Sequence, residues 1–181
     1  MILEARLLRN REHLSTVSDT KPGYYKWWAT YKALDILLRK LDVDFSNISP
    51  VLEKKDCLYC IYVGIAVKES LRRRLNWHIN QKHTDSAVKN GALSTLRQTI
   101  SSVVAHDQYN EQETNKFIDL LKIEYFELPY EIRSAEAKQE IHKIERELMS
   151  SSLRILNIQE NHHLQANEIK TKLRKIRKNS K

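Results

Sequence analysis

The protein has 181 residues, of which 41% are hydrophobic and 30% are charged, and its formal net charge is +8. This length and composition suit one soluble globular domain and exclude wholesale disorder. No apolar run approaches the ~20 residues that span a bilayer, the N-terminus MILEARLLRNREHL lacks the pattern of a signal peptide, and there are only two cysteines, so we expect a cytoplasmic protein without a membrane partner.

The first part of the chain is predicted to contain two strands between helices. Residues 1–17 carry apolar side chains at helical spacing, which predicts a helix that ends before Pro22. The aromatic segment YYKWWA, residues 24–29, is typical of a strand, and helical periodicity returns over 31–41. A polar segment then leads to a second strand over 57–65.

The second part is predicted to be mostly helical. A basic helix over 69–82 is followed by helices over 94–105 and 111–121. The segment KIEYFELP is a third strand that Pro129 ends, and a long helix follows over 132–151. Few strands among many helices indicate an α+β fold, with a small sheet covered by helices.

Most of the positive charge lies at the C-terminal end. Seven Lys or Arg and one Glu between 168 and 181 give a net charge of +6, which leaves +2 of the total +8 for residues 1–167. Such a segment favours a polyanion, most simply nucleic acid, through counterion release. A solvated, frayed helix end that only keeps the protein soluble is an equally good interpretation.

Alternation along the two aromatic strands predicts which side chains share a face. Tyr25 lies on one face of the first strand, and Leu58, Cys60, Tyr62 and Gly64 share a face of the second. If the strands pair, Tyr25 and Tyr62 lie on the same face, each near a glycine that lets another group approach the backbone. Taken singly, either tyrosine is better explained as a core or rim residue of the sheet.

The basic helix directs two polar side chains toward the sheet. Leu71 and Leu75 define its buried stripe, and Arg74 and His78 follow them at helical spacing on the same face. An arginine that points toward the sheet needs an ion-pair or hydrogen-bond partner, or a functional role. A structural ion pair at the edge of the sheet is the alternative interpretation.

The long helix shows the same pattern with a carboxylate. Glu145 falls inside the apolar arc, between Ile141 and Met149, whereas Glu147 falls outside it. A divalent metal ion would compensate the cost of burying that carboxylate. Asn157 ends the LRILN segment twelve residues later.

Together these positions resemble the GIY-YIG nuclease domain. GYY at 23–25 and YVG at 62–64 are similar to its first two strands, and Arg74, Glu145 and Asn157 follow in the family's order over roughly residues 22–158. Each motif alone is weak, but the ordered set is fairly specific. A histidine four residues after the arginine is similar to the type II restriction branch.

The resemblance implies a fold and a division of the chain. The expected core is a three-stranded antiparallel sheet flanked by helices. We predict an N-terminal helical extension over 1–21, a nuclease domain over 22–158 with a helical insertion at about 85–121, and a basic tail over 159–181.

The resemblance also implies a DNA endonuclease that hydrolyses phosphodiester bonds with one Mg²⁺ or Mn²⁺ per active site. Glu145 would bind the metal, Tyr25 would act as general base or orient water, and Arg74 would neutralise charge on the phosphate. Tyr62 and His78 would hold the phosphate, the water or Tyr25, and Asn157 would brace the site. Because one chain offers one active site, a concerted double-strand break would require a homodimer.

Basic residues around this site are expected to contact nucleic acid. They are Lys26, Lys68, Arg72, Arg73, Arg97, Arg174, Lys175 and Arg177. The sequence differs from the family pattern at one position. Ile65 follows the YVG glycine where many members carry a lysine, a charge that Lys26 or Lys68 would have to replace.

Other interpretations of the same residues remain open. A nucleic-acid-binding module could keep the fold and have lost cleavage, and a helical interaction domain could match the motifs by chance. Cys57, Cys60, His78 and His83 also invite a zinc-finger interpretation. Their pairs are separated by more than the usual ~12 residues, and cysteines three apart on a strand face opposite sides.

Overall fold

Five antiparallel strands form one sheet in a computed structural model that describes residues 1–181. The strand order is β1–β5–β2–β4–β3, and the bounds are β1 (Ile2–Glu4), β2 (Gly23–Thr30), β3 (Lys54–Lys55), β4 (Leu58–Ala66) and β5 (Lys122–Glu127). The α+β class is confirmed, and the three central strands are those predicted. The number of strands is not, because β1 and β3 are too short to show an alternating pattern.

The N-terminal segment differs from the single helix that its leucines predict. Ile2 to Glu4 instead pair with β5, a 3-10 turn η1 (Ala5–Arg9) follows, and only α1 (Arg11–Ser15) is α-helical. Asn10 starts α1 by accepting a hydrogen bond from the amide of Glu12 at 2.8 Å. Sheet pairing of Ile2 and Leu3 therefore overrides their local helical spacing.

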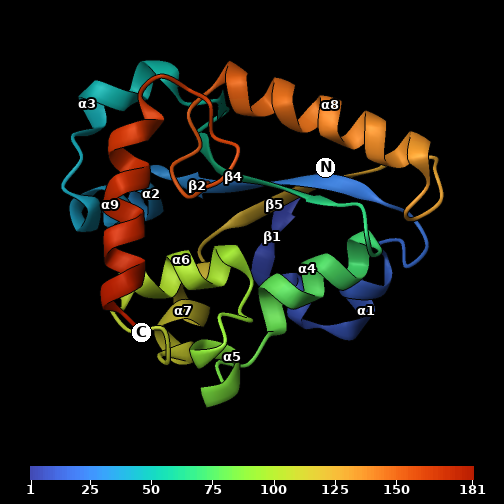
Figure 1. Ribbon diagram of the computed structural model, residues 1–181, viewed down its shortest axis with the longest axis horizontal. Coiled ribbons are helices and arrows are strands. Elements are labelled where there is room, and N and C mark those ends of the chain that lie inside the picture. Colours follow the sequence, from blue (N-terminus) through green and yellow to red (C-terminus); the bar gives the residue numbers. More distant parts are fainter.

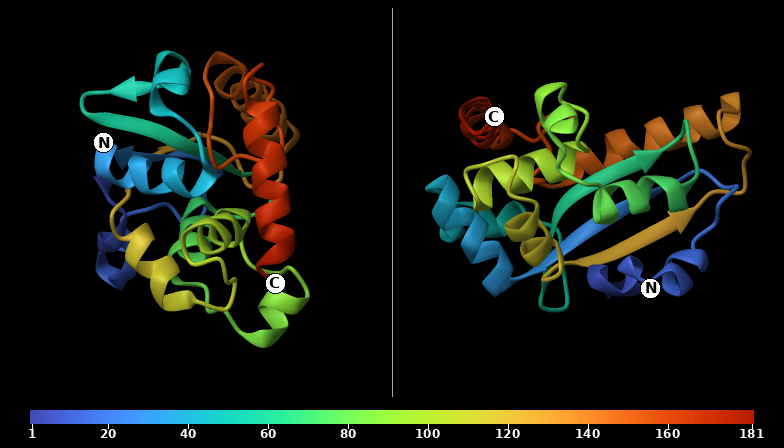
Figure 2. Two further views of the ribbon diagram at one scale, coloured as in Figure 1. Left: turned by 90° about the vertical axis from the view of Figure 1, so that its left-hand side faces the viewer. Right: turned by 90° about the horizontal axis from the view of Figure 1, so that it is seen from below.

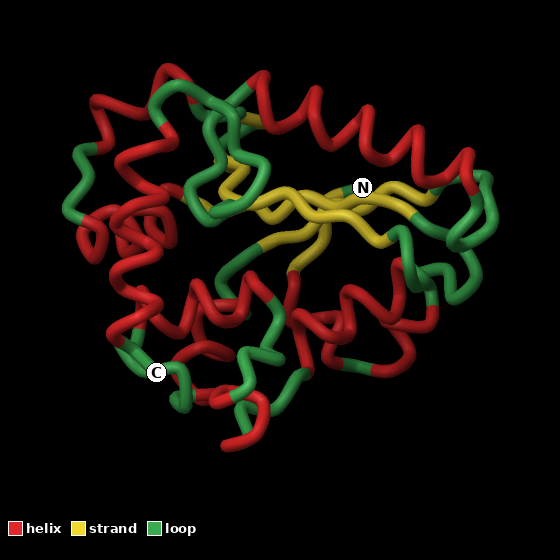
Figure 3. Tube along the Cα trace, in the orientation of Figure 1, coloured by secondary structure: helices red, strands yellow, loops and turns green.

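Helices cover both faces of the sheet (Figures 1 and 3). In Figure 1, α8 lies above the sheet, and α1, α4, α6 and α7 lie below it. The bounds are α2 (Tyr31–Leu41), α3 (Phe45–Ile48), α4 (Leu71–Asn80), α5 (Asp85–Lys89), α6 (Thr95–Val104), α7 (Glu111–Ile118), α8 (Ala135–Ser151) and α9 (Ala166–Asn179), with a 3-10 turn η2 (Ser49–Val51). No helix combines the length and hydropathy that crossing a bilayer requires.

Side-chain caps fix where the helices that carry the site begin. The hydroxyl of Ser70 accepts a hydrogen bond from the amide of Arg73 at the start of α4, and that of Ser134 accepts one from Ala137 at the start of α8. Each cap satisfies an amide that has no partner within its helix. The caps set the positions from which α4 and α8 present their inward side chains.

The apolar side chains form two clusters, one on each side of the sheet. The larger includes Tyr25, Trp27 and Leu71, and the smaller joins Trp28 of β2 to Met149 of α8. The prediction that Cys60 and Tyr62 share a face is wrong. The register slips where Trp27 pairs with Tyr62 but Trp28 pairs with Cys60, so β4 contains one extra residue there and its faces exchange.

The basic C-terminal segment is a packed helix. Ala166, Ile169 and Leu173 of α9 are buried in the larger cluster, and α9 stands beside α6 at one end of the molecule (Figure 2). The hydroxyl of Ser180 bonds that of Ser102 at 2.7 Å, which fastens the end of the chain to α6. The basic segment is therefore docked on the fold rather than frayed.

Candidate active site

The two tyrosines meet where β2 pairs with β4. Tyr25 lies opposite Gly64, and a Cβ at Gly64 would come within 2.3 Å of the Tyr25 hydroxyl oxygen. Only glycine leaves room for the phenol ring over the β4 backbone. Gly23 has a similar role where β2 pairs with β5, because a Cβ there would lie 2.2 Å from the carbonyl oxygen of Phe126. Gly64 therefore makes room for Tyr25, and Gly23 lets β2 pack closely against β5.

Tyr25 and His78 form a buried hydrogen-bonded pair. The tyrosine hydroxyl lies 2.5 Å from Nε2 of His78, and both residues are 1% exposed. Burial raises the pKa of Tyr25 well above its usual value and lowers the pKa of His78, with Arg74 and Arg97 adding to the effect on the histidine. Both groups are therefore neutral, and one hydrogen bond joins the phenol to Nε2 of His78.

A pocket of about 250 Å³ collects the remaining predicted residues. Tyr25, Tyr62, Arg74, Glu145 and Asn157 all line it. They come from β2, β4, α4, α8 and the loop between α8 and α9, so segments far apart in the sequence converge at one edge of the sheet. The structure thus brings together five of the six residues assigned catalytic roles, with His78 bonded to Tyr25 behind them.

Arg74 enters the pocket from α4 in a partly buried position. Its Nη2 lies 2.7 Å from Oε1 of Glu69, and its guanidinium carbon lies 4.8 Å from the centre of the Trp77 ring. Nε of Arg74 is buried and has no hydrogen-bond partner. The side chain is therefore held in place by Glu69 and Trp77 while one donor remains available.

Glu145 approaches the same pocket from α8 and has no Lys or Arg partner. Nδ1 of His142 lies 3.4 Å from its Oε2, and Glu160 lines the same pocket. Burial raises the pKa of Glu145, an effect that the hydrogen bond with His142 opposes and Glu160 reinforces. A half-buried carboxylate in this setting is stabilised by a cation.

The residues at this point fit a divalent ion that keeps most of its water. No group of three or more His, Cys, Asp and Glu is arranged to hold a metal ion. Glu145 and Glu160 instead both line the pocket and could offer carboxylate oxygens to an ion there. Mg²⁺ is commonly bound by one or two carboxylates, with waters and phosphate oxygens completing its coordination. The donor set fits Mg²⁺ or Mn²⁺ better than a metal enclosed by protein ligands.

Asn157 braces a buried part of the β4 edge that has no neighbouring strand, beneath the pocket. Its Oδ1 accepts a hydrogen bond of 2.9 Å from the amide of Val63, and its Nδ2 donates one of 2.8 Å to the carbonyl of the same residue. One side chain thus satisfies both polar groups of a residue that has no neighbouring strand on that side. The expected bracing role agrees with this geometry.

The basic residues expected to contact nucleic acid are scattered. Lys68 and Arg73 are exposed beside the pocket, and Arg174 and Lys175 are exposed on α9. Arg72 bonds the carbonyls of Val17 and Ser15 at 2.7 and 2.8 Å and anchors the N-terminal segment.

Three of these expectations require correction or revision. Arg97 is wrong as a surface contact because it is fully buried and bonds the carbonyls of His78 and Ile79, each at 3.1 Å. Lys26 lies on the strand face opposite Tyr25 and pairs with Glu53 at 2.6 Å. Arg177 bonds the side chain of Gln98. None of the three presents a free cation at the pocket.

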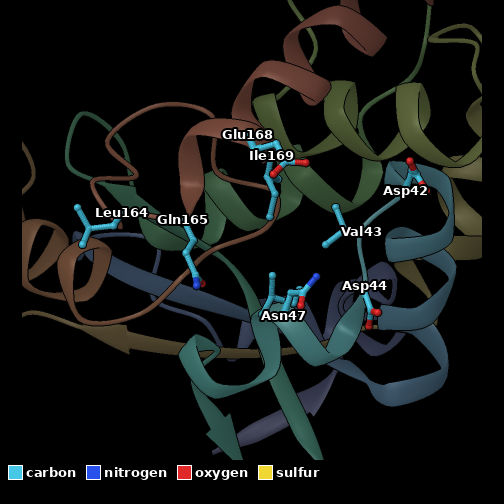
Figure 4. Close-up of a pocket in the computed structure, with 9 residues that line it drawn as sticks. Asp42, Val43, Asp44, Asn47, Leu164, Gln165, Glu168 and Ile169 are labelled. Carbon is cyan, nitrogen blue, oxygen red and sulfur yellow. The ribbon is translucent and has the colours of Figure 1, made fainter.

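A second cavity lies apart from this site (Figure 4). It has a volume of about 340 Å³ and opens between the end of α2, α3 and the start of α9. Asp42, Asp44 and Glu168 are among its lining residues, and it shares no residue with the pocket around Tyr25. None of the predicted functional residues lines it.

Sequence reasoning missed several neighbours of the site. His142 stands three residues before Glu145, so helical spacing alone would have placed it beside that carboxylate. Glu69 precedes the capped start of α4, and Glu160 lies in a loop with a left-handed backbone at φ 54°. No periodic pattern predicts a contact from such positions.

Comparison with known families agrees with this arrangement. The family model of the GIY-YIG catalytic domain matches residues 23–179, which include β2, β4, α4, α8 and α9. No curated protein and no solved structure matches the chain. The matched range covers most of the sequence, so the resemblance of its motifs is confirmed, and the chain belongs to the GIY-YIG catalytic domain family.

Proposed function

We propose that the protein is a metal-dependent endonuclease that hydrolyses phosphodiester bonds in DNA. GIY-YIG domains are generally nucleases. The observation that carries the proposal is the pocket in which Tyr25, Tyr62, Arg74, Glu145 and Asn157 converge from separate elements. An arginine and a carboxylate that line one pocket suit phosphoryl transfer, which depends on positioning and charge stabilisation.

Arg74 is proposed to bind the phosphate that is cleaved. Its unpartnered Nε and its Nη2, once released from Glu69, offer two donors to phosphate oxygens. Tyr62 lines the same pocket, and its hydroxyl would supply a further donor. Charge that develops on the phosphate would then be stabilised by groups already in place.

Tyr25 and His78 are proposed to move the proton of the attacking water. Water attacks phosphorus, the bond to the leaving oxygen breaks, and that oxygen takes up a proton from solvent. Tyr25 accepts the proton of the water while its own proton passes to Nε2 of His78 along the 2.5 Å hydrogen bond. In the free protein both groups are neutral, and Arg74 acts to lower the pKa of Tyr25.

Glu145 is proposed to hold Mg²⁺ or Mn²⁺ beside the phosphate. When bound, the ion would supply Lewis-acid polarisation of the phosphate and neutralise its negative charge. His142 orients the carboxylate through its contact at 3.4 Å, and Asn157 keeps the β4 edge in position below it. Ile65 lines the pocket as an apolar residue, so the cationic role rests on Arg74 and the ion.

Site-specific, restriction-like cleavage by a homodimer is included in the proposal. It is supported by His78 four residues after Arg74, by the helices α5 to α7 inserted after α4, and by the single active site per chain. Cleavage of both strands at one location needs two such sites. Plasmid and genomic DNA would then give discrete fragments rather than a smear.

The test compares Glu145→Gln with Glu147→Gln on plasmid DNA. Glu147 lies two residues away on the same helix but is exposed and lines none of the pockets around the site. Cleavage should occur with Mg²⁺ or Mn²⁺, stop with EDTA, fall by at least about 100-fold in Glu145→Gln and persist in Glu147→Gln. Salt-sensitive DNA retention without any cleavage would favour a binding module instead.

A further inference from the structure

We propose that three hollows beside the active site form one groove that binds the phosphate backbone of double-stranded DNA. This proposal rests on the proposed function and extends it to residues that the family motifs do not contain. The groove runs from the side of α4, across the turn after β4, to the start of α8. It is named here the flanking groove and is defined by Lys68, Trp77, Arg133, Lys138 and His142.

The hollows adjoin one another and the active-site pocket through shared lining residues. The first has a volume of about 680 Å³ and shares Lys68, Arg74 and Arg133 with the second, which is equally large. The second shares Lys138 and His142 with the third, of about 580 Å³. Arg74 also lines the active-site pocket, so a strand bound there would extend into the flanking groove.

The cations of the flanking groove are free of carboxylate partners. Lys68, Arg133 and Lys138 are exposed and form no ion pair, whereas Lys26, Lys55 and several other lysines are each paired with an acidic residue. Unpaired cations lining a channel are a typical footprint for a polyanion, because each neutralised phosphate releases a counterion. Arg74, which is paired with Glu69, lies at the active-site end of the flanking groove.

Arg133 is held in a fixed orientation within the flanking groove. Its backbone is left-handed, with φ 68°, its amide donates to the carbonyl of Val67 at 3.0 Å, and its Nε donates to the carbonyl of Lys68 at 3.0 Å. The terminal nitrogens of the guanidinium form no hydrogen bond or ion pair with the protein. Strained backbone outside glycine is uncommon and clusters at functional positions, and a preoriented guanidinium suits phosphate recognition.

The aromatic content of the flanking groove favours duplex over single-stranded DNA. Single-strand binding relies on aromatic rings on which successive bases stack. Trp77 is the only Trp, Tyr or Phe that lines the three hollows, and the Arg74 guanidinium lies 4.8 Å from its ring centre. The flanking groove thus offers charges for a backbone and no row of rings for unstacked bases.

The test measures binding without cleavage. Every chain carries Glu145→Gln and is studied in EDTA with a short labelled duplex, so neither outcome depends on turnover. Lys68→Gln, Arg133→Gly and Lys138→Gln are combined and compared with Arg11→Gln, Lys32→Gln and Lys143→Gln. The control residues are exposed, unpaired and outside the hollows, and Lys143 shares α8 with Lys138. Glycine at 133 suits the left-handed backbone, and thermal melting checks the fold of both chains.

Removing three phosphate contacts should reduce the slope of log K against log salt by about 2 to 3, and should raise the Kd for the duplex at least tenfold near physiological salt. The chain with the three control substitutions should keep the salt slope of the Glu145→Gln chain to within about 1. Equal slopes for the two triples would overturn the groove, and so would a single strand that binds as tightly as the duplex. If these binding results are obtained but the wild-type chain does not cleave DNA, the groove proposal stands and only the proposed nuclease function is contradicted.

Discussion

The hydroxyl of Tyr25 lies 2.5 Å from Nε2 of His78, and Gly64 leaves the space in which this contact forms. Both side chains are almost completely buried, and burial favours the neutral form of each. The proton therefore stays on the tyrosine in the free protein. His78 Nδ1 has no hydrogen-bond partner, so Tyr25 makes the only side-chain hydrogen bond that orients the ring.

Tyr25→Phe should abolish cleavage while the protein stays folded. The change removes the group that accepts the proton of the attacking water, and general-base catalysis typically contributes 10²–10⁴-fold, so we expect a loss of about that size in single-turnover rate. Tyr24→Phe is the matched control, because its ring stacks on Phe126 at 4.6 Å outside the pocket. A Tyr25→Phe chain that cleaves at the wild-type rate would contradict the proposed role.

The free energy of unfolding should fall as the pH drops below about 6.5, the usual pKa of histidine. The folded state holds His78 neutral with a lowered pKa, so the unfolded chain binds more protons in this range. The contribution is complete above the unfolded pKa and is lost below it by up to about 1.4 kcal/mol per pH unit. Urea unfolding at several pH values measures this slope.

His78→Gln should flatten this dependence, since Gln does not titrate. His83 also has a pKa lowered by burial and by Arg97, so some slope should remain and His83→Gln serves as the comparison. A slope that His78→Gln leaves unchanged would show that other groups cause it.

Gly64→Ala should destabilise the fold through its contact with Tyr25. The added methyl would lie 2.3 Å from the hydroxyl oxygen and 2.4 Å from Cζ of the ring, which forces the ring away from His78. Overpacking of this kind costs about 1–3 kcal/mol, and activity should fall with it. The coupling is tested by repeating the change in a Tyr25→Ala chain, where the clash is absent. If Gly64→Ala lowers the free energy of unfolding equally in the wild-type and Tyr25→Ala chains, the contact with Tyr25 is not the cause.

Much of this arrangement follows from local patterns in the sequence. The predicted helix over 31–41 coincides with α2, and helical spacing placed Arg74 and His78 on the inner face of α4. Glu145 was separated from Glu147 by the same reasoning. These positions are predictable because 3.6-residue periodicity relates each of them to apolar neighbours within two turns.

Other features depend on contacts between distant segments, which no local pattern contains. The extra residue in β4 exchanges the faces of Cys60 and Tyr62, and β1 exists only because Ile2 and Leu3 meet β5. Arg97 was expected at the surface from its charge. Its burial is possible because His78, Ile79, His83 and Asn115 all supply acceptors, a set assembled only in the folded chain.

Glu69→Gln should strengthen binding of DNA by freeing Arg74. In the protein without substrate, Oε1 of Glu69 occupies Nη2 of Arg74 at 2.7 Å, where a phosphate oxygen is proposed to bind. Both side chains are about a quarter exposed, so solvent screens the pair and the gain should be about three- to fivefold in Kd, within the ~1 kcal/mol typical of such pairs.

The measurement uses the Glu145→Gln background in EDTA, with Glu131→Gln as an exposed control that removes the same charge. A Kd that falls for Glu69→Gln and not for Glu131→Gln identifies Glu69 as a competitor of the phosphate. If Glu69→Gln weakens binding, the carboxylate instead positions Arg74, because an arginine without its partner adopts more rotamers and loses preorganisation. The two roles thus predict opposite signs, and one titration decides between them.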